Sequence, residues 1–250
     1  MSLKGAVLAT SLGALAVTSI AAGLLGLWGQ RDLFGETQRL FLQNDQAVLE
    51  RVLNEEQASL AERAESLTKH SEIGQAFAQR KAEALEEYAT PVFNRLNKQG
   101  VSRLRFFTPD GQLLFQAHGG PAEGGAGRFV QEALKQIRQV GGLDLDHGEL
   151  VLSVAFPYYA QGEMAGVLQM GAGLTRAVNA MRGILGSQIG VFTLRGDEAA
   201  LQSATDPSLV STAAGLFPLK GKLSHPVREV RRHDGVAYAL SLIPLESEPG

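Results

Sequence analysis

Residues 101–117, VSRLRFFTPDGQLLFQA, decide the fold of this chain. The first seven alternate as a β-strand does, and residues 108–111 (TPDG) place a proline and an Asp-Gly pair where a tight turn favours them. Residues 112–117 then return as a partner strand. The stretch therefore predicts an antiparallel β-hairpin.

The chain after this hairpin is typical of a small sheet with helices. We predict a glycine-rich loop over 118–127, a helix over about 128–140, strands over 150–156 and 166–171, and an amphipathic helix over 174–185. Together with the hairpin, these elements predict an α+β module with an antiparallel sheet.

A weaker order of the same kind follows. We predict a strand over 189–195, a short helix opened by Asp206 and Pro207, and a hairpin formed by 226–232 and 236–243. Residues 244–250 look like a turn before another strand, and a sheet edge left open there would expose unpaired backbone groups. We therefore expect the chain to be a fragment of a longer one, or to have lost its natural remainder.

Helical patterns dominate the chain before the hairpin. Leucines recur every seven residues between 42 and 67, which predicts an amphipathic stalk helix of about 35–40 residues with a narrow apolar stripe. We expect a break near residues 70–74 and a second helix up to residue 97. A narrow stripe on an outward helix needs a partner, so we predict a homodimer whose stalk helices meet through Leu49, Leu53, Leu60 and Leu67.

Residues 5–30 contain no charged side chain. As a helix this run is about 40 Å long, more than the roughly 30 Å hydrocarbon core of a bilayer. Trp28 stands near its outer end, and Lys4 on the short stub at residues 1–4 places that stub in the cytoplasm. We predict an uncleaved transmembrane signal anchor over 5–29 in a bacterial inner membrane, with the bulk of the chain in the periplasm. A cleavable signal peptide, cut after the Ala-Leu-Ala run at 14–16, is the alternative.

The composition argues against several classes of protein. There are no cysteines, which excludes disulfides, thiolate metal sites and thiol nucleophiles, and the net charge of −3 gives no support to a nucleic-acid partner. The sequence has no His-Glu-x-x-His, no Gly-x-Ser-x-Gly and no phosphate-binding loop. The sequence favours neither an enzyme nor a cofactor. We predict no metal site either, although Asp144, Asp146 and His147 stand close together in the chain.

The order of these elements resembles a double Cache extracellular sensor region of bacterial chemoreceptors, sensor histidine kinases and membrane diguanylate cyclases. The residues that carry the resemblance are 103–111 (RLRFFTPDG), Arg128, 142–143, 152–159 (LSVAFPYY) and 166–171 (GVLQMG). The resemblance implies helices over 30–98, a PAS-like, membrane-distal Cache module over 99–185, and a partial, membrane-proximal one over 186–250. We call these two segments the first and the second module.

The resemblance also implies a function. The chain would be the periplasmic input region of a membrane-anchored signal transducer, binding a small molecule and passing a conformational change to a cytoplasmic output domain outside this sequence. It departs from the amino-acid-binding pattern of the family, because it lacks the Arg-x-Trp-Tyr cluster and its single tryptophan is Trp28. A periplasmic structural or assembly protein held by one helix is the alternative, although it does not explain the repeated sheet modules.

The candidate ligand site lies in the first module, between the sheet and the loop at 118–127. Arg103 and Arg105 lie on one face of their strand by its two-residue period and could bind an anion, or could form a solvated edge. Arg128 opens a helix, where an anion or a structural ion pair is expected.

Aromatic and amide side chains complete the candidate site. Phe156, Tyr158 and Tyr159 flank a proline at a strand end and could line a small-molecule pocket, or could pack against the stalk helix. Gln169 lies inside a strand, where a buried carboxamide must find a partner. His118 is expected to be an exposed loop residue.

Overall fold

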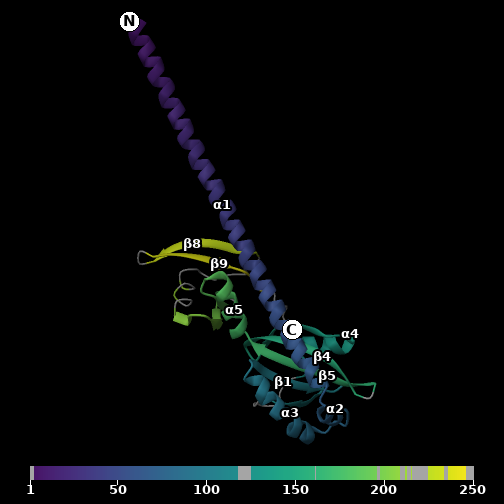
Figure 1. Cartoon of the computed structure of the whole chain (residues 1–250). Coiled ribbons are helices and arrows are strands. Elements are labelled where there is room, and N and C mark those ends of the chain that lie inside the picture. The colour runs from purple at the N-terminus through teal and green to yellow at the C-terminus, as the bar shows by residue number, and fades with distance from the viewer. Residues whose placement is uncertain are drawn as a thin grey trace.

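The computed structural model describes residues 3–117, 125–160, 162–195, 198–208, 212, 215, 225–233 and 236–245. Within its helices and strands, the side chains of residues 3–35, 194, 195, 198, 231, 233 and 236–238 are not described. The described chain has a mixed helical and antiparallel-sheet architecture, built along one long helix (Figure 1). This agrees with the α+β class that the sequence predicts.

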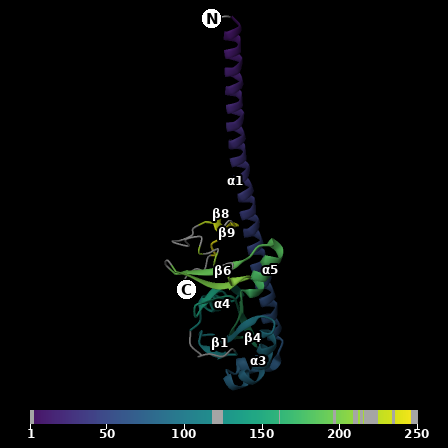
Figure 2. The same cartoon turned by 90° about the vertical axis from the view of Figure 1, so that its left-hand side faces the viewer.

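The long helix α1 spans Leu3–Thr68, so the predicted anchor and stalk lie on one continuous helix. Its N-terminal part extends well beyond the rest of the molecule in both views (Figures 1 and 2). The predicted anchor at residues 5–29 lies among the residues whose side chains are not described. Among the described residues, no helix has both the length and the apolar character needed to cross a bilayer.

The second predicted helix is two helices, α2 (Ser71–Ala78) and α3 (Ala82–Asn97). They are separated by a turn in which Arg80 has a left-handed backbone, with φ of 54°. The Lys81 N–H donates to Ala76 O at 2.9 Å and the Arg80 N–H donates to Phe77 O at 3.0 Å, which satisfies carbonyls at the end of α2. The turn lets both helices lie against the sheet of the first module.

The first module contains a five-stranded antiparallel sheet. Its strands, β1 (Val101–Phe107), β2 (Leu113–Gln116), β3 (Val140–Asp146), β4 (Glu149–Ala160) and β5 (Glu163–Gly173), lie in the order β2-β1-β5-β4-β3. The predicted hairpin at 101–117 is confirmed as β1–β2. Strand β3 was not predicted, because residues 140–146 (VGGLDLD) combine two glycines with two aspartates, which are poor strand formers.

Helices cover the two faces of this sheet differently. Helices α1, α2 and α3 pack on one face, where Leu104, Phe106, Val154 and Met170 join Leu60, Phe77 and Leu85 in one core cluster. Helix α4 (Arg128–Gln136) packs on the other face, where its Phe129, Val130 and Ala133 contact Phe107, Ala155 and Val167. We call the first the stalk face and the second the α4 face.

The leucine stripe of the stalk faces the chain's own sheet. Leu60 and Leu67 are buried in the core cluster of the stalk face, and Leu49 and Leu53 pack against a second cluster built around Val48 and Val52. The prediction that these four leucines form the seam between two chains is therefore wrong. The periodicity correctly predicted an apolar stripe, but intramolecular packing covers it.

The second module is smaller in the described residues. Helix α5 (Thr175–Leu185) leads to β6 (Gly190–Arg195) and β7 (Glu198–Ala204), which pair with each other, and β8 (Val227–His233) pairs with β9 (Val236–Leu242). The hairpin at 226–243 was predicted and β7 was not. The short helix after Asp206 begins at Pro207, and most of its predicted extent lies outside the described residues.

Candidate functional site

The α4 face of the first module carries a group of polar side chains. Arg105 pairs across the sheet with Gln169, and Gln169 pairs with Ala155, which packs against α4. Arg103 lies in the next row and pairs with Gly171, which pairs with Ser153. Since directly paired residues share a face, both arginines and Gln169 lie on the side of α4. The sheet register confirms the prediction that Arg103 and Arg105 lie on one face of their strand.

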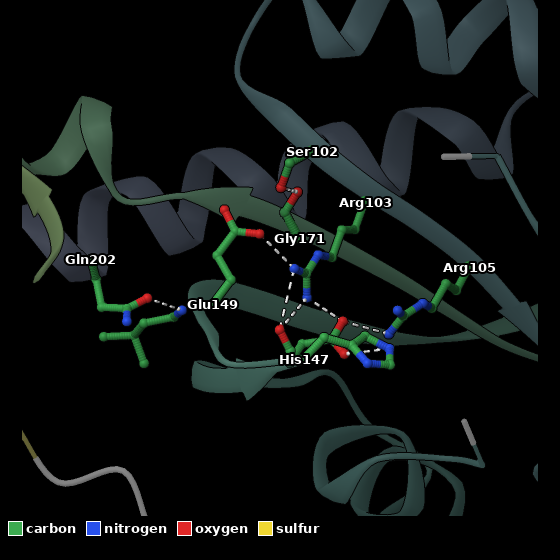
Figure 3. A network of polar contacts seen from close by, with 9 residues as sticks. Ser102, Arg103, Arg105, His147, Glu149, Gly171 and Gln202 are labelled. Carbon is green, nitrogen blue, oxygen red and sulfur yellow. Dashed lines mark hydrogen bonds and ion pairs between the residues drawn. The ribbon is translucent and has the colours of Figure 1, made fainter. Parts of the chain in front are cut away.

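Both arginines are held by the turn between β3 and β4. Arg103 and Arg105 form ion pairs with the same carboxylate oxygen of Asp146, at 2.8 Å for Arg105 Nη1, and Arg103 Nη2 lies 2.8 Å from Glu149 Oε2 (Figure 3). The two arginines and Asp146 expose only 12–16% of their side chains. A pair of arginines bridged by one carboxylate is strongly held in such an environment.

The geometry of the turn brings the carboxylates to the arginines. Asp146 pairs with Glu149, and the two residues between them, His147 and Gly148, have positive φ angles of 52° and 84°. This is the backbone of a two-residue hairpin turn of the type that matches strand twist. Because paired residues point to one side, Asp146 and Glu149 both face the arginines.

Small residues make room for the long Arg103 side chain. Arg103, Gly171, Ser153 and Gly142 form one row across four strands. A Cβ atom at Gly171 would lie 3.3 Å from Arg103 Cβ and 3.6 Å from Ser153 Oγ. The row therefore lets the Arg103 guanidinium lie over the sheet and reach Asp146 and Glu149.

One guanidinium nitrogen on this face keeps unused hydrogen-bonding capacity. The Arg105 Nε atom is buried and has no hydrogen-bond partner among the described residues. Gln169 and Ser153 are 6% and 2% exposed. Because a buried polar group without a partner costs free energy, this donor is suited to bind an acceptor atom of a ligand.

Asp144 adds an acid with an altered titration. It lies on the same face, opposite Val151, and burial raises the pKa of its carboxyl, with a further increase from the charge of Asp146. A hydrogen bond from the Leu145 N–H and the charges of Arg103 and Arg105 oppose that rise. Among the described residues, no group of three or more His, Cys, Asp or Glu side chains is arranged to hold a metal ion.

The aromatic candidates do not lie with the arginines. Tyr158 is 2% exposed in the core of the stalk face, stacks edge-on against Phe77, and its hydroxyl donates to Thr68 O at 3.4 Å. Phe156 alternates with Tyr158 along β4 and so belongs to the same face. Tyr159 follows a register shift and is half exposed.

Arg128 begins α4, as predicted, directly after the cap residue Gly127. Its guanidinium lies 5.5 Å from the ring centroid of Phe129, a cation–π distance. His118 and most of the predicted loop, residues 118–124, lie outside the described residues.

Sequence reasoning missed Asp146, Glu149 and Ser153 as parts of this face. The Asp-x-Asp run at residues 144–146 suggests at most a metal site when the local sequence is taken alone. Its charge complementarity to Arg103 and Arg105, more than 40 residues earlier in the chain, was the available signal. The arginines are on β1 and Asp146 is on β3, with β5 and β4 between these strands. Only this strand order shows that the opposite charges are in contact. A surface hollow of about 580 Å³, lined by residues at the start of α3, is a separate feature.

Comparison with known protein families gives one match. The family model dCache_3, described as the double sensory domain of a two-component sensor kinase, matches residues 41–247. No curated protein matches the sequence significantly.

Three solved structures illustrate the similarity. The periplasmic domain of Vibrio cholerae LuxQ is 14% identical, with coverage of 80% of this chain and 99% of that one and a TM-score of 0.49. The sensor domain of the V. cholerae histidine kinase DctB is 14% identical over 76% of this chain and 83% of that one, with a TM-score of 0.48. The ligand-binding domain of the Campylobacter jejuni chemoreceptor Tlp3, in complex with L-valine, is 14% identical over 82% and 85%, with a TM-score of 0.44.

Proposed function

The chain belongs to the dCache_3 family of double sensory domains of two-component sensor kinases, and from this premise we propose that it is the periplasmic, ligand-sensing input region of a membrane-anchored signal transducer. In this proposal, residues 5–29 anchor the chain in the inner membrane of a bacterium. The first module binds a small molecule, and α1 passes the resulting change to a cytoplasmic output domain. The chain itself has no catalytic role.

We place the ligand on the α4 face of the first module. The observation that carries this proposal is the buried Nε of Arg105, which has no hydrogen-bond partner among the described residues and lies beside Gln169 on the neighbouring strand. An arginine that is nearly buried and incompletely bonded favours an acceptor group such as a carboxylate. We include Arg128 in the proposed site because it begins α4, whose next residue, Phe129, packs on this face.

The candidate aromatic residues have two different roles in this proposal. Tyr158 transmits rather than binds, because it joins β4 to the end of α1 through its hydroxyl. Phe156 shares the stalk face with it. Tyr159, half exposed beyond the register shift, remains available to a ligand that extends along β4.

A homodimer is part of the same proposal, with an interface other than the four leucines. If each chain signals through one helix, the signal is a displacement of that helix relative to a second helix, so two chains are required. The exposed Leu40 and Phe41, on the part of α1 that precedes the core clusters, are residues through which two chains could meet.

The test of the function is a ligand screen on the full chain in detergent micelles. A ligand at about one hundred times its Kd stabilises the folded state by about 2.7 kcal/mol, which a thermal-unfolding screen against metabolites detects. We expect Arg105→Gln to weaken the binding of the identified compound by about 10- to 100-fold in calorimetry, the value of one charge-assisted hydrogen bond.

The control for this experiment is Arg51→Gln. Arg51 forms an exposed pair with Glu55 on α1, so its loss changes the charge equally without touching the α4 face. Unchanged affinity in a folded Arg105→Gln variant contradicts the proposed site. If no compound in the screen stabilises the chain, the sensing function is contradicted.

A further inference from the structure

We propose that residues 146–150, which we call the coupling turn, link the occupancy of Arg103 and Arg105 to the contact between the first and the second module. The turn is held at one end by the two arginines and at the other by β7. An anion at the arginines and the second module therefore act on the same five residues.

The first end of the coupling turn is bound by charge. Asp146 bridges both arginines, its backbone carbonyl accepts from Arg103 Nη2 at 3.4 Å, and Glu149 accepts from the same guanidinium at 2.8 Å (Figure 3). Arg103 thus contacts the turn on both of its strands. The position of the turn depends on these arginines being free to bind it.

The second end is bound to β7. Strand β5 ends at Gly173, opposite Val151, so the next amide along β4, that of Leu150, lies beyond the end of the ladder. The Leu150 N–H donates instead to Gln202 Oε1 at 3.0 Å (Figure 3). Gln202 is itself held, because its Nε2 donates to Thr193 Oγ1 of β6 at 3.0 Å.

Packing reinforces this second contact. The Leu150 side chain is 6% exposed and belongs to the cluster that contains Met181 of α5 and Val191 of β6. The backbone and the side chain of one residue of the coupling turn therefore both contact the second module. A displacement of the turn changes both contacts together.

An incoming anion competes with the turn. Asp146 occupies Nη1 of both Arg103 and Arg105, so a carboxylate that binds the Arg105 Nε and also takes these Nη1 donors must replace Asp146. The released Asp146 and Glu149 no longer fix the turn, and the hydrogen bond of Leu150 to Gln202 weakens. The trigger rests on the proposed function, but the coupling between the two ends of the turn does not, and it can be measured without a ligand.

The experiment measures hydrogen exchange at the Leu150 amide in the full chain in detergent. Asp146→Asn and Glu149→Gln imitate the loss of the arginine contacts. We expect each to accelerate exchange of the Leu150 amide by at least about tenfold, with exchange at Leu104 in the middle of the sheet unchanged. Glu163→Gln is the matched control, because it removes the same charge from the first residue of β5, which pairs with Ala160 at the opposite end of β4.

Unchanged Leu150 exchange in both variants overturns the proposal. If Asp146→Asn also accelerates exchange at Leu104, the sheet itself has opened in that variant. The Glu149→Gln variant then provides the test of the coupling, because the Glu149 side chain is 62% exposed. The double variant Glu149→Gln with Gln202→Leu gives the second measurement. Coupling predicts that its effect on unfolding is not the sum of the two single effects, and additivity overturns it. Neither result depends on Arg105→Gln or on ligand binding.

Discussion

Asp144 shows how burial alters one residue of the candidate site. Its carboxyl lies half-buried on the α4 face, and burial raises its pKa first, followed by repulsion from Asp146. An acid whose pKa is raised in the folded state binds protons more tightly there than in the unfolded chain. At pH values above the raised pKa, the ionised carboxylate of Asp144 therefore lowers the free energy of unfolding. This destabilisation disappears as the pH falls below the ordinary pKa of an aspartate.

We predict that Asp144→Asn stabilises the chain at about pH 7 and has no such effect at about pH 3, where Asp144 is protonated in both states. The asparagine oxygen can still accept the Leu145 N–H, so the backbone contact is kept. Thermal unfolding of the wild type and the variant across this pH range tests the prediction. A difference in melting temperature that is constant with pH contradicts it.

At the scale of elements, strand β4 and helix α2 meet at a close contact. A Cβ atom at Gly74 of α2 would lie 2.7 Å from the Tyr158 hydroxyl oxygen and 3.6 Å from its Cζ. Tyr158 is 2% exposed and cannot move aside without disturbing its packing against Phe77. The hydroxyl, rather than the ring, therefore requires glycine at position 74.

We predict that Gly74→Ala destabilises the wild type by about 1–3 kcal/mol, the cost of overpacking a core. In a Tyr158→Phe background the same change should be stabilising by up to about 1 kcal/mol, because alanine is the better helix former. Tyr158→Phe alone should cost at most about 1 kcal/mol, since it loses one long hydrogen bond. Urea denaturation of the four proteins provides the test, and equal effects of Gly74→Ala in both backgrounds would refute it.

At the scale of the whole molecule, α1 is the element that both modules contact. The lower part of the helix packs on the sheet of the first module through Leu60 and Leu67. Further toward the N-terminus, Asp45 accepts hydrogen bonds from Ser241 at 2.6 Å and from Arg228 at 3.2 Å, and the Arg228 guanidinium lies 4.9 Å from the Phe41 ring centroid. The β8–β9 hairpin is thereby held on the helix (Figure 1).

We predict that Asp45→Ala releases the β8–β9 hairpin from α1 and leaves the first module intact. The loss of a half-buried acceptor for two donors should cost about 1–3 kcal/mol locally. This should accelerate amide exchange in β8 and β9 by roughly 5- to 100-fold, with no change in β1, β4 or β5. Glu50→Ala is the control, because Glu50 is exposed on the same helix and accepts a hydrogen bond from Gln46 of that helix. Equal protection of the hairpin in both variants contradicts the prediction.

Local patterns in the sequence determined the elements that depend on near neighbours. The β1–β2 hairpin forms where TPDG predicted it, with the Thr108 N–H donating to Gln112 O at 2.9 Å. The start of α4 at Arg128 and the β8–β9 hairpin are likewise where the sequence predicted them. The break after α1 falls at residues 69 and 70, because residues 71–74 of the predicted break already belong to α2. Residues within a few positions of each other decide these features, so composition and spacing suffice.

The tertiary structure alone decided what these elements contact. The leucine stripe covers the chain's own sheet, β3 forms as an edge strand on β4 despite its glycines, and Tyr158 lies on the face opposite Arg105. The ion pair between Asp146 and Arg103 depends on the strand order, in which β5 and β4 lie between β1 and β3. Local periodicity specifies which side chains share a face, but strand order and the choice of partner depend on the packing of residues far apart in the chain.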